Sequence, residues 1–296
     1  MTTYSQNQVS AISRLFSSTV VRELARYGRS PAFARLSREA LAGRKAIPRR
    51  RVGQFLDSAF EVLKRVDCRH EYIYKAALTH NILLGTHRLH TASMLNEFRV
   101  GACKADVAIL NGTATVYEIK SERDSLSRLE KQIETYRGFF AKVYVIAGEN
   151  HIDGVDEIVP GDVGILRLSS RNSISKIREA KDRPERTSAI TIFESIRTEE
   201  AKRILAYLDV EVPDAPNTEM HAALREKFEK LRARKVHEAM VCVLKKTRNL
   251  LPLSELVEQL PGSLQPAALS VPMRKADHER LIEAVKTPLQ TAVQWG

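Results

Sequence analysis

Two acidic residues and one lysine stand on neighbouring segments of strand-forming sequence near the middle of this 296-residue chain. Asp106 lies in the apolar segment ADVAIL, and Glu118 and Lys120 lie in the alternating, β-branched segment TATVYEIK. The pair Asn111–Gly112 separates the segments, and Asn-Gly is a strong signal for a hairpin between antiparallel strands. Asp106 is five residues before this pair and Glu118 is six residues after it. The two carboxylates are therefore expected near each other across the hairpin.

Glu118 and Lys120 are two residues apart on one strand, so both project from the same face of the sheet. Buried carboxylates are costly unless a cation joins them. A hard divalent cation such as Mg²⁺ suits this group, because it binds one or two carboxylates together with water and substrate phosphate, and the carbonyl of Ile119 could be a further ligand. Lys120 would orient the attacking water or stabilise the charge on phosphorus. The same spacing also fits a cross-strand ion pair on a solvent-facing sheet.

The stretch also resembles the PD-(D/E)XK nuclease superfamily, on the pattern of Asp106, a hairpin and the Glu-Ile-Lys at 118–120. The following helical segment carries Gln132 and Tyr136, which is similar to the QxxxY motif of the RecB-like branch. Glu97, just before the first expected strand, matches the acidic residue that many members carry on a preceding helix. The longer run of EIKSE, RL, Q and Y resembles an uncharacterised family of bacterial and phage proteins in that superfamily. The resemblance covers roughly residues 94–168.

The resemblance implies a restriction-endonuclease-like core that hydrolyses phosphodiester bonds of DNA with Mg²⁺ or Mn²⁺, in phage defence or in the biology of a mobile element. It implies that Asp106 and Glu118 bind the metal, with the Ile119 carbonyl and Glu97 as further ligands or supporting groups.

The remaining roles follow from the same resemblance. Lys120 would act on the water or on the transition state, and Gln132 and Tyr136 would order the site or contact DNA. Arg128 could reach a phosphate. Asp124-Ser125 is interpreted as the cap of a helix over residues 125–141.

The chain carries a net charge of +11, and residues 1–90 hold 16 Lys or Arg against 6 acidic side chains, which is +10 of that excess. A basic surface fits a polyanionic partner, because each phosphate that is neutralised releases counterions. The segment Gly43–Arg51 (GRKAIPRRR) is interpreted either as a solvated loop or as an arm that contacts phosphates through Arg49, Arg50 and Arg51.

The order of expected elements is helices, three strands, a helix, a strand, a loop and a strand, which indicates an α/β fold with a mixed sheet and helical additions at both ends. We expect a basic helical region at 1–90, a nuclease core at 91–170 and a helical region at 188–296.

Other segments give more local expectations. The spacing of apolar residues predicts single helices over 8–27 and over Met220–Leu244. The polar segment 169–186 is expected to be a linker, and the tail from Pro288 is expected to fray.

Three distant cysteines, the lack of a signal-peptide pattern and the lack of any run near 18 apolar residues favour a cytoplasmic protein without a membrane span. Two rival functions stay open. One is a catalytically silent module of the same fold that binds nucleic acid. The other is a nuclease subunit that docks a protein partner through its C-terminal helices. The sequence leaves DNA versus RNA and the oligomeric state undecided.

Overall fold

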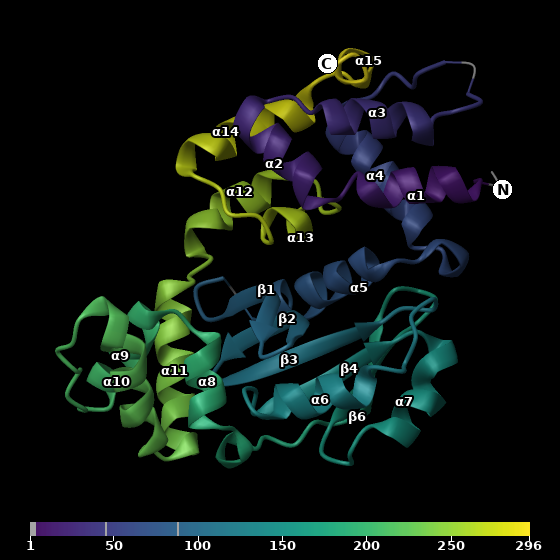
Figure 1. The fold of residues 1–296 in the computed structure, drawn as a ribbon. Helices are drawn as coiled ribbons and strands as arrows, with labels where there is room; N and C mark the ends of the chain where they lie inside the picture. The colour runs from purple at the N-terminus through teal and green to yellow at the C-terminus, as the bar shows by residue number, and fades with distance from the viewer. Residues whose placement is uncertain (1–3, 45, 88) are drawn as a thin grey trace. The chain divides into compact units, whose positions relative to one another are not determined.

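The computed structural model describes residues 4–44, 46–87 and 89–296. The chain divides into two compact units, one formed by Met1–Thr79 together with Pro252–Gly296 and one formed by His80–Leu251 (Figure 1). The second unit is thus inserted between the two parts of the first. Among the described residues, no helix is both long enough and apolar enough to cross a membrane.

The first unit is built from helices. Short 3₁₀ turns lie at η1 (Val66–Cys68) and at η5 (Leu251–Leu253), where the chain returns from the second unit, and the π-helical turn η2 (Thr79–Leu84) lies where the chain enters it. The helices are α1 (Gln6–Arg14), α2 (Ser18–Tyr27), α3 (Pro31–Ala40), α4 (Val52–Leu63), α5 (Glu71–Leu78), α12 (Ser254–Gln259), α13 (Gln265–Ala268), α14 (Lys275–Lys286) and α15 (Leu289–Ala292).

The single helix expected over 8–27 is wrong, because the chain breaks between α1 and α2. Ser17 is the N-cap of α2, and its side chain accepts a hydrogen bond from the backbone N–H of Val20. A serine in this position satisfies one of the N–H groups that a new helix leaves without a partner. The apolar spacing continues through the break, which is why periodicity alone did not show it.

The end of the chain is packed, so the fraying expected from Pro288 is wrong. Leu289 is fully buried, and its backbone N–H donates to the carbonyl of Arg50 at 2.8 Å. The ring of Trp295 lies 5.8 Å from that of Phe33, centroid to centroid. The last helix therefore completes the core of the first unit.

The second unit holds a six-stranded sheet with the order β1-β2-β3-β4-β5-β6. The first three strands are antiparallel, β3, β4 and β5 are parallel, and β6 is antiparallel to β5. This arrangement confirms the mixed α/β fold with flanking helices. The strands are β1 (Ser93–Val100), β2 (Cys103–Asn111), β3 (Thr113–Lys120), β4 (Lys142–Ala147), β5 (Gly164–Leu168) and β6 (Ile174–Arg178).

Helices of the second unit pack against one face of this sheet and share a single core with it. Helix α6 contacts β2 and β4, and α11 contacts β2 and β3. Leu129, Ile133 and Tyr136 of α6 and Met240 of α11 are buried in that core. The helices are α6 (Leu129–Arg137), α7 (Ile152–Ile158), α8 (Ala189–Ser195), α9 (Thr198–Tyr207), α10 (Asn217–Glu229) and α11 (Ala233–Thr247), with 3₁₀ turns η3 (Glu149–His151) and η4 (Pro184–Arg186).

Two further expectations are wrong in this unit. The polar segment 169–186 is not only a linker, because it contains the edge strand β6. The single helix expected over Met220–Leu244 is two helices, α10 and α11, with a turn at residues 230–232. Neither Gly nor Pro marks that turn in the sequence.

Candidate active site

The hairpin between β2 and β3 brings the two carboxylates of the motif together. Asn111 pairs with Thr113 across Gly112, whose φ of +71° is in the region that favours glycine. The regular pairing ends at Val107 opposite Tyr117, one step before Asp106 and Glu118. The sequence-based register is therefore correct, and these two residues follow the last regular pair.

Asp106 extends the β2–β3 ladder with its side chain. Its Oδ2 accepts a hydrogen bond from the backbone N–H of Ile119 at 2.8 Å. In an antiparallel pair the N–H and the C=O of one residue point to the same side of the strand. The Ile119 carbonyl therefore points toward β2 as well, on the side of the Asp106 carboxylate.

The alternation of side chains between the two faces of the sheet is interrupted near Asp106 on β2 and near Glu97 on the adjacent strand β1. The core-facing residues of β1 include Leu95 and then Phe98, and those of β2 include Ala105 and then Ala108, so each strand skips a step between them. Glu97, inside the skipped step of β1, has a φ of +54°. Such a conformation is uncommon for a residue with a side chain and costs on the order of 1–2 kcal/mol.

Glu118 and Lys120 form a buried ion pair on the face of β3 that carries α6. Only 2% of Glu118 and 6% of Lys120 is exposed. Lys120 Nζ donates to Glu118 Oε1 at 2.9 Å and to Gln132 Oε1 at 2.9 Å. An ammonium has three N–H donors, so a third remains for a further acceptor. The solvent-facing ion pair, the alternative interpretation of this pattern, is wrong because the pair is buried.

Tyr136 holds the second oxygen of Glu118. Its hydroxyl lies 2.9 Å from Glu118 Oε2 and 3.0 Å from the carbonyl of Lys104. A hydroxyl has one proton, and a carboxylate is the stronger acceptor. Burial raises the pKa of Tyr136, and the negative charge of Glu118 raises that pKa further, so the hydroxyl stays protonated.

Gln132 and Tyr136 reach this group because they are four residues apart on α6 and share one face of the helix. The structure therefore joins Glu118, Lys120, Gln132 and Tyr136 in one hydrogen-bonded cluster. Asp106 binds the backbone of Ile119, the residue between Glu118 and Lys120.

Glu97 lies beside the cluster but does not match the helical position that the resemblance implied. It stands inside β1, with 57% of its side chain exposed, and its Oε2 accepts from Lys104 Nζ at 2.9 Å. Lys104 connects Glu97 to the cluster: its amine donates to Glu97, and its backbone carbonyl lies 3.0 Å from the hydroxyl of Tyr136. The sequence did not suggest this role. The position of Lys104, two residues before Asp106, was the only feature of the sequence that could have indicated this role.

The loop before α6 corrects one local interpretation. Helix α6 begins at Leu129 with Arg128 at the N-cap, so Asp124-Ser125 does not cap it. Asp124 Oδ2 instead accepts from the backbone N–H and the hydroxyl of Ser121, at 2.7 and 2.6 Å. Arg128 is exposed, and its side chain makes no hydrogen bond or ion pair with the other described residues.

Comparison with known proteins identifies the family of this chain. The family model described as Bacteriophage P4 protein cII matches residues 64–254, which is more than half of the chain. The chain belongs to this family.

A curated member, Protein cII of Enterobacteria phage P4, is 33% identical over 105 residues. That match covers 35% of this chain and 36% of the phage protein, so the chain spans about a third of the length of this relative. Among solved structures, a protein of unknown function from Silicibacter pomeroyi, SPO1766, is similar at 20% identity with a TM-score of 0.31, over 46% of this chain and 89% of that one.

Three oxygen donors of this cII-family chain, from Asp106, Glu118 and the Ile119 carbonyl, are of the type that a hard cation takes. The described residues contain no group of three or more His, Cys, Asp or Glu side chains placed to hold a metal ion. Mg²⁺ needs fewer protein ligands than that, because it binds through one or two carboxylates and keeps several of its water ligands. Asp106 and Glu118 supply two carboxylates, which is the number of protein carboxylates such a site commonly uses.

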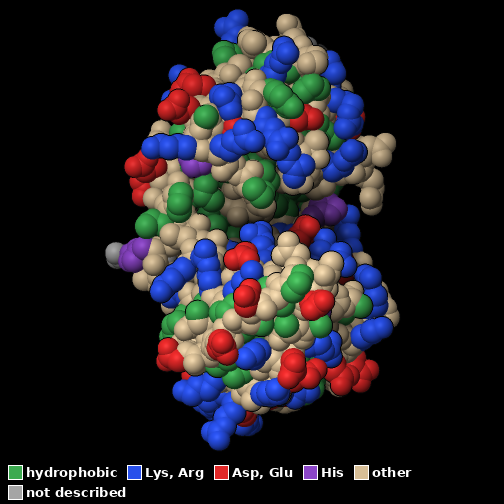
Figure 2. Space-filling view, turned by 60° about the vertical axis from the view of Figure 1, so that its left-hand side comes forward, with side chains coloured by type: hydrophobic (Ala, Val, Ile, Leu, Met, Phe, Trp, Pro, Cys, Tyr) green, Lys and Arg blue, Asp and Glu red, His purple; other side chains and the backbone are tan. Residues whose placement is uncertain are grey.

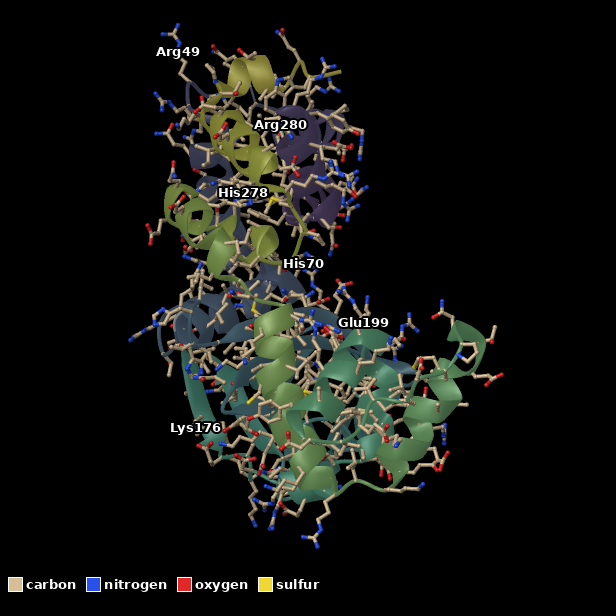
Figure 3. All side chains as sticks on the ribbon, turned by 90° about the vertical axis from the view of Figure 1, so that its left-hand side faces the viewer. Arg49, His70, Lys176, Glu199, His278 and Arg280 are labelled. Carbon is tan, nitrogen blue, oxygen red and sulfur yellow. The ribbon has the colours of Figure 1, made fainter. Side chains whose placement is uncertain are left out.

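The basic segment 43–51 belongs to the first unit, whereas the cluster belongs to the second. Arg49, Arg50 and Arg51 are exposed, and Arg49 points away from its unit into solvent (Figure 3). Arg50 donates to the hydroxyl of Ser58 at 2.6 Å. Lys45 lies outside the described residues.

Proposed function

We propose that the second unit is a metal-dependent nuclease that hydrolyses phosphodiester bonds of DNA. One observation carries the proposal. The buried pair of Glu118 and Lys120 is held by two side chains of α6, and the Asp106 carboxylate binds the backbone N–H of the residue between them. Buried charge of this kind is an expensive way to stabilise a sheet, so a chemical role explains it better.

Asp106, Glu118 and the Ile119 carbonyl would hold Mg²⁺ or Mn²⁺. When bound, such an ion polarises a phosphoryl oxygen and lowers the pKa of water at the site.

The chain's own residues would then do three things. Lys120 offers its third N–H to the attacking water or to a phosphate oxygen, where a positive charge stabilises the negative charge that develops. Gln132 holds Lys120 in place. Tyr136 remains protonated and fixes Glu118, so that the carboxylate keeps one orientation.

Membership of a phage family supports a setting in a mobile element or in phage defence. A second candidate function, DNA binding without cleavage, is favoured by the charge of the first unit. Its residues include 19 Lys or Arg and 11 acidic side chains, a net charge of +8. The third alternative, a subunit that needs a protein partner at the C-terminal helices, predicts cleavage only when that partner is added.

The test is incubation of the purified chain with plasmid, linear duplex, single-stranded DNA and RNA, each with Mg²⁺, Mn²⁺ or EDTA. We expect cleavage of DNA that EDTA abolishes and that Asp106→Asn and Lys120→Met reduce at least a hundredfold. Asp153→Asn and Lys131→Met are matched controls on exposed positions of the same unit and should cut like the parent. Cleavage by Asp106→Asn at the parental rate would refute the proposal.

A further inference from the structure

Helices α2 and α3 of the first unit form a short, fixed pair. Three residues separate them, and the first, Gly28, has a φ of +66° and ends α2 with a hydrogen bond from its N–H to the carbonyl of Leu24 at 2.9 Å. Ser30 begins α3 by accepting from the backbone N–H of Phe33 at 2.9 Å. Two short helices joined by a three-residue turn that contains glycine share the turn length and the turn glycine of a helix-turn-helix.

Glu23 locks this turn. Its Oε2 accepts from the hydroxyl of Ser30 at 2.6 Å and from the backbone N–H of Ala32 at 3.2 Å. A side chain of α2 thus holds the first turn of α3. Leu24 of α2 and Phe33 of α3 are fully buried. The pair is therefore a fixed element of the unit, with one face in the core and the other in solvent.

The solvent face of α2 is a row of arginines. Arg22 and Arg26 are one helical turn apart, about 6 Å along the axis, and Arg29 follows in the turn. All three are exposed, and none of their side chains makes a hydrogen bond or ion pair with the other described residues. Lys and Arg side chains gather in a band across the first unit (Figure 2). Three unpaired guanidinium groups at this spacing suit successive phosphates of a nucleic acid strand.

Helix α3 presents two further arginines. Arg38 is exposed and makes no such contact with the other described residues. Arg35 pairs with Glu39 at 2.7 Å, but both side chains are nearly half exposed, and pairs of this kind contribute little. Both arginines are thus available to a partner at small cost.

We propose that α2 and α3 form a helix-turn-helix that binds duplex DNA. Arg22, Arg26 and Arg29 contact the phosphate backbone, while α3 enters the major groove with Arg35 and Arg38 toward the base edges. The width of a helix, about 10–12 Å, matches the roughly 12 Å major groove of B-DNA, whereas the major groove of an RNA duplex is too narrow for it. The arginines alone indicate a polyanionic partner, and the identification of that partner as nucleic acid rests on the proposed function. The inference adds that the DNA is a duplex, and it names the element that recognises the duplex.

The test uses the full chain in EDTA, so that binding is measured without cleavage. Fluorescence anisotropy with a labelled 30-base-pair DNA duplex, a single strand of the same sequence and the matching RNA duplex gives the affinity over a series of salt concentrations. We expect Arg22→Ala/Arg26→Ala/Arg29→Ala to lower the affinity at least tenfold. It should also reduce the slope of log affinity against log salt by about 3, since each lost phosphate contact removes about 0.9.

Two variants make the comparison specific. The first replaces the same three arginines by lysine and should bind within a fewfold of the parent. The second, Arg171→Ala/Arg203→Ala/Arg232→Ala, removes the same charge from exposed positions of the second unit and should retain the parental slope. Selection from a library of random duplexes then tests α3, where Arg35→Ala/Arg38→Ala should lose any base preference of the parent.

Equal affinity of the two triple alanine variants would overturn the proposal. So would binding of the RNA duplex or the single strand as tightly as the DNA duplex. The outcome is separate from that of the nuclease test. Duplex binding in EDTA without cleavage in Mg²⁺ would refute only the nuclease, and cleavage with unchanged binding by the alanine variant of α2 would refute only the helix-turn-helix.

Discussion

The ammonium of Lys120 donates to the carboxylate of Glu118 at 2.9 Å in a place where both side chains are almost completely buried. Such a pair is costly to form and costlier to break, because removal of one partner leaves an uncompensated charge in the core. The first prediction tests whether this relationship holds the second unit together or serves its chemistry.

We expect Lys120→Met to lower the free energy of unfolding of the second unit by about 3–5 kcal/mol, because Glu118 would then lack its counter-charge. The double variant Glu118→Leu/Lys120→Met should recover most of that loss, since apolar residues of similar volume replace a buried pair at little cost. Urea unfolding followed by circular dichroism measures both. Lys131→Met, on the exposed side of α6, is the control. A double variant that recovers none of the loss, and so stays as far below the parent as Lys120→Met, would show that the pair itself is a net source of stability.

Asp106 gives a second test, because its charge and its hydrogen bond can be separated. Asp106→Asn keeps an oxygen for the N–H of Ile119 and should change stability by less than about 1 kcal/mol. Asp106→Ala leaves that buried N–H without its acceptor and should cost about 1–3 kcal/mol. Both should abolish cleavage. If only the alanine variant lost activity, the role of Asp106 would be to join the strands rather than to hold a metal.

The strands and the cluster were predictable because the signals were local and redundant. Asn111–Gly112 fixed the turn, alternation fixed the faces of β3, and together they placed Asp106 beside Glu118. Helical spacing then placed Gln132 and Tyr136 on one side of α6. The double role of Lys104 was not predictable, because it depends on a backbone carbonyl and on the unusual conformation of Glu97.

The errors share a physical cause. Apolar periodicity reports burial, and burial continues across a break when both helices pack on the same core, as with α10 and α11. Edge strands such as β6 bury few of their side chains, so their sequence resembles that of a polar loop. The burial of Leu289 depends on α4, more than two hundred residues earlier in the chain, and no local pattern carries that information.

His237 on α11 predicts a loss of stability in acid. It is 2% exposed, and its Nε2 is buried without a hydrogen-bond partner among the described residues. Burial lowers its pKa from 6.5 to about 4, with Asp182 opposing that shift and Arg234 adding to it. Because the folded pKa is depressed, stability is fully present above pH 6.5 and falls as the pH drops toward 4. The loss reaches about 3 kcal/mol, at 1.36 kcal/mol for each pKa unit.

The measurement is urea unfolding at intervals from pH 7.5 to pH 4. His237→Leu removes the titrating group and should flatten the curve in this window, while His278→Leu in the first unit should leave the unfolding of the second unit unchanged. A curve as steep in His237→Leu as in the parent would assign the acid sensitivity to other groups.

Replacement of Glu97 is the last test. Loss of the strained backbone should raise stability, whereas loss of the carboxylate should lower the cleavage rate. The φ of +54° at Glu97 strains most residues with a Cβ, so Glu97→Gly should stabilise the second unit by up to about 1 kcal/mol, even though it removes the exposed pair with Lys104. If Glu97 supports the metal, the same change should lower cleavage and raise the Mg²⁺ concentration needed for half-maximal rate.

Glu97→Asn is the matched control, because asparagine tolerates this conformation but lacks the charge. Thermal unfolding and a metal titration of the cleavage rate give the two readouts. A gain in stability with loss of activity in both variants would mean that the strain at Glu97 is retained for function. Unchanged activity in both would limit Glu97 to its contact with Lys104.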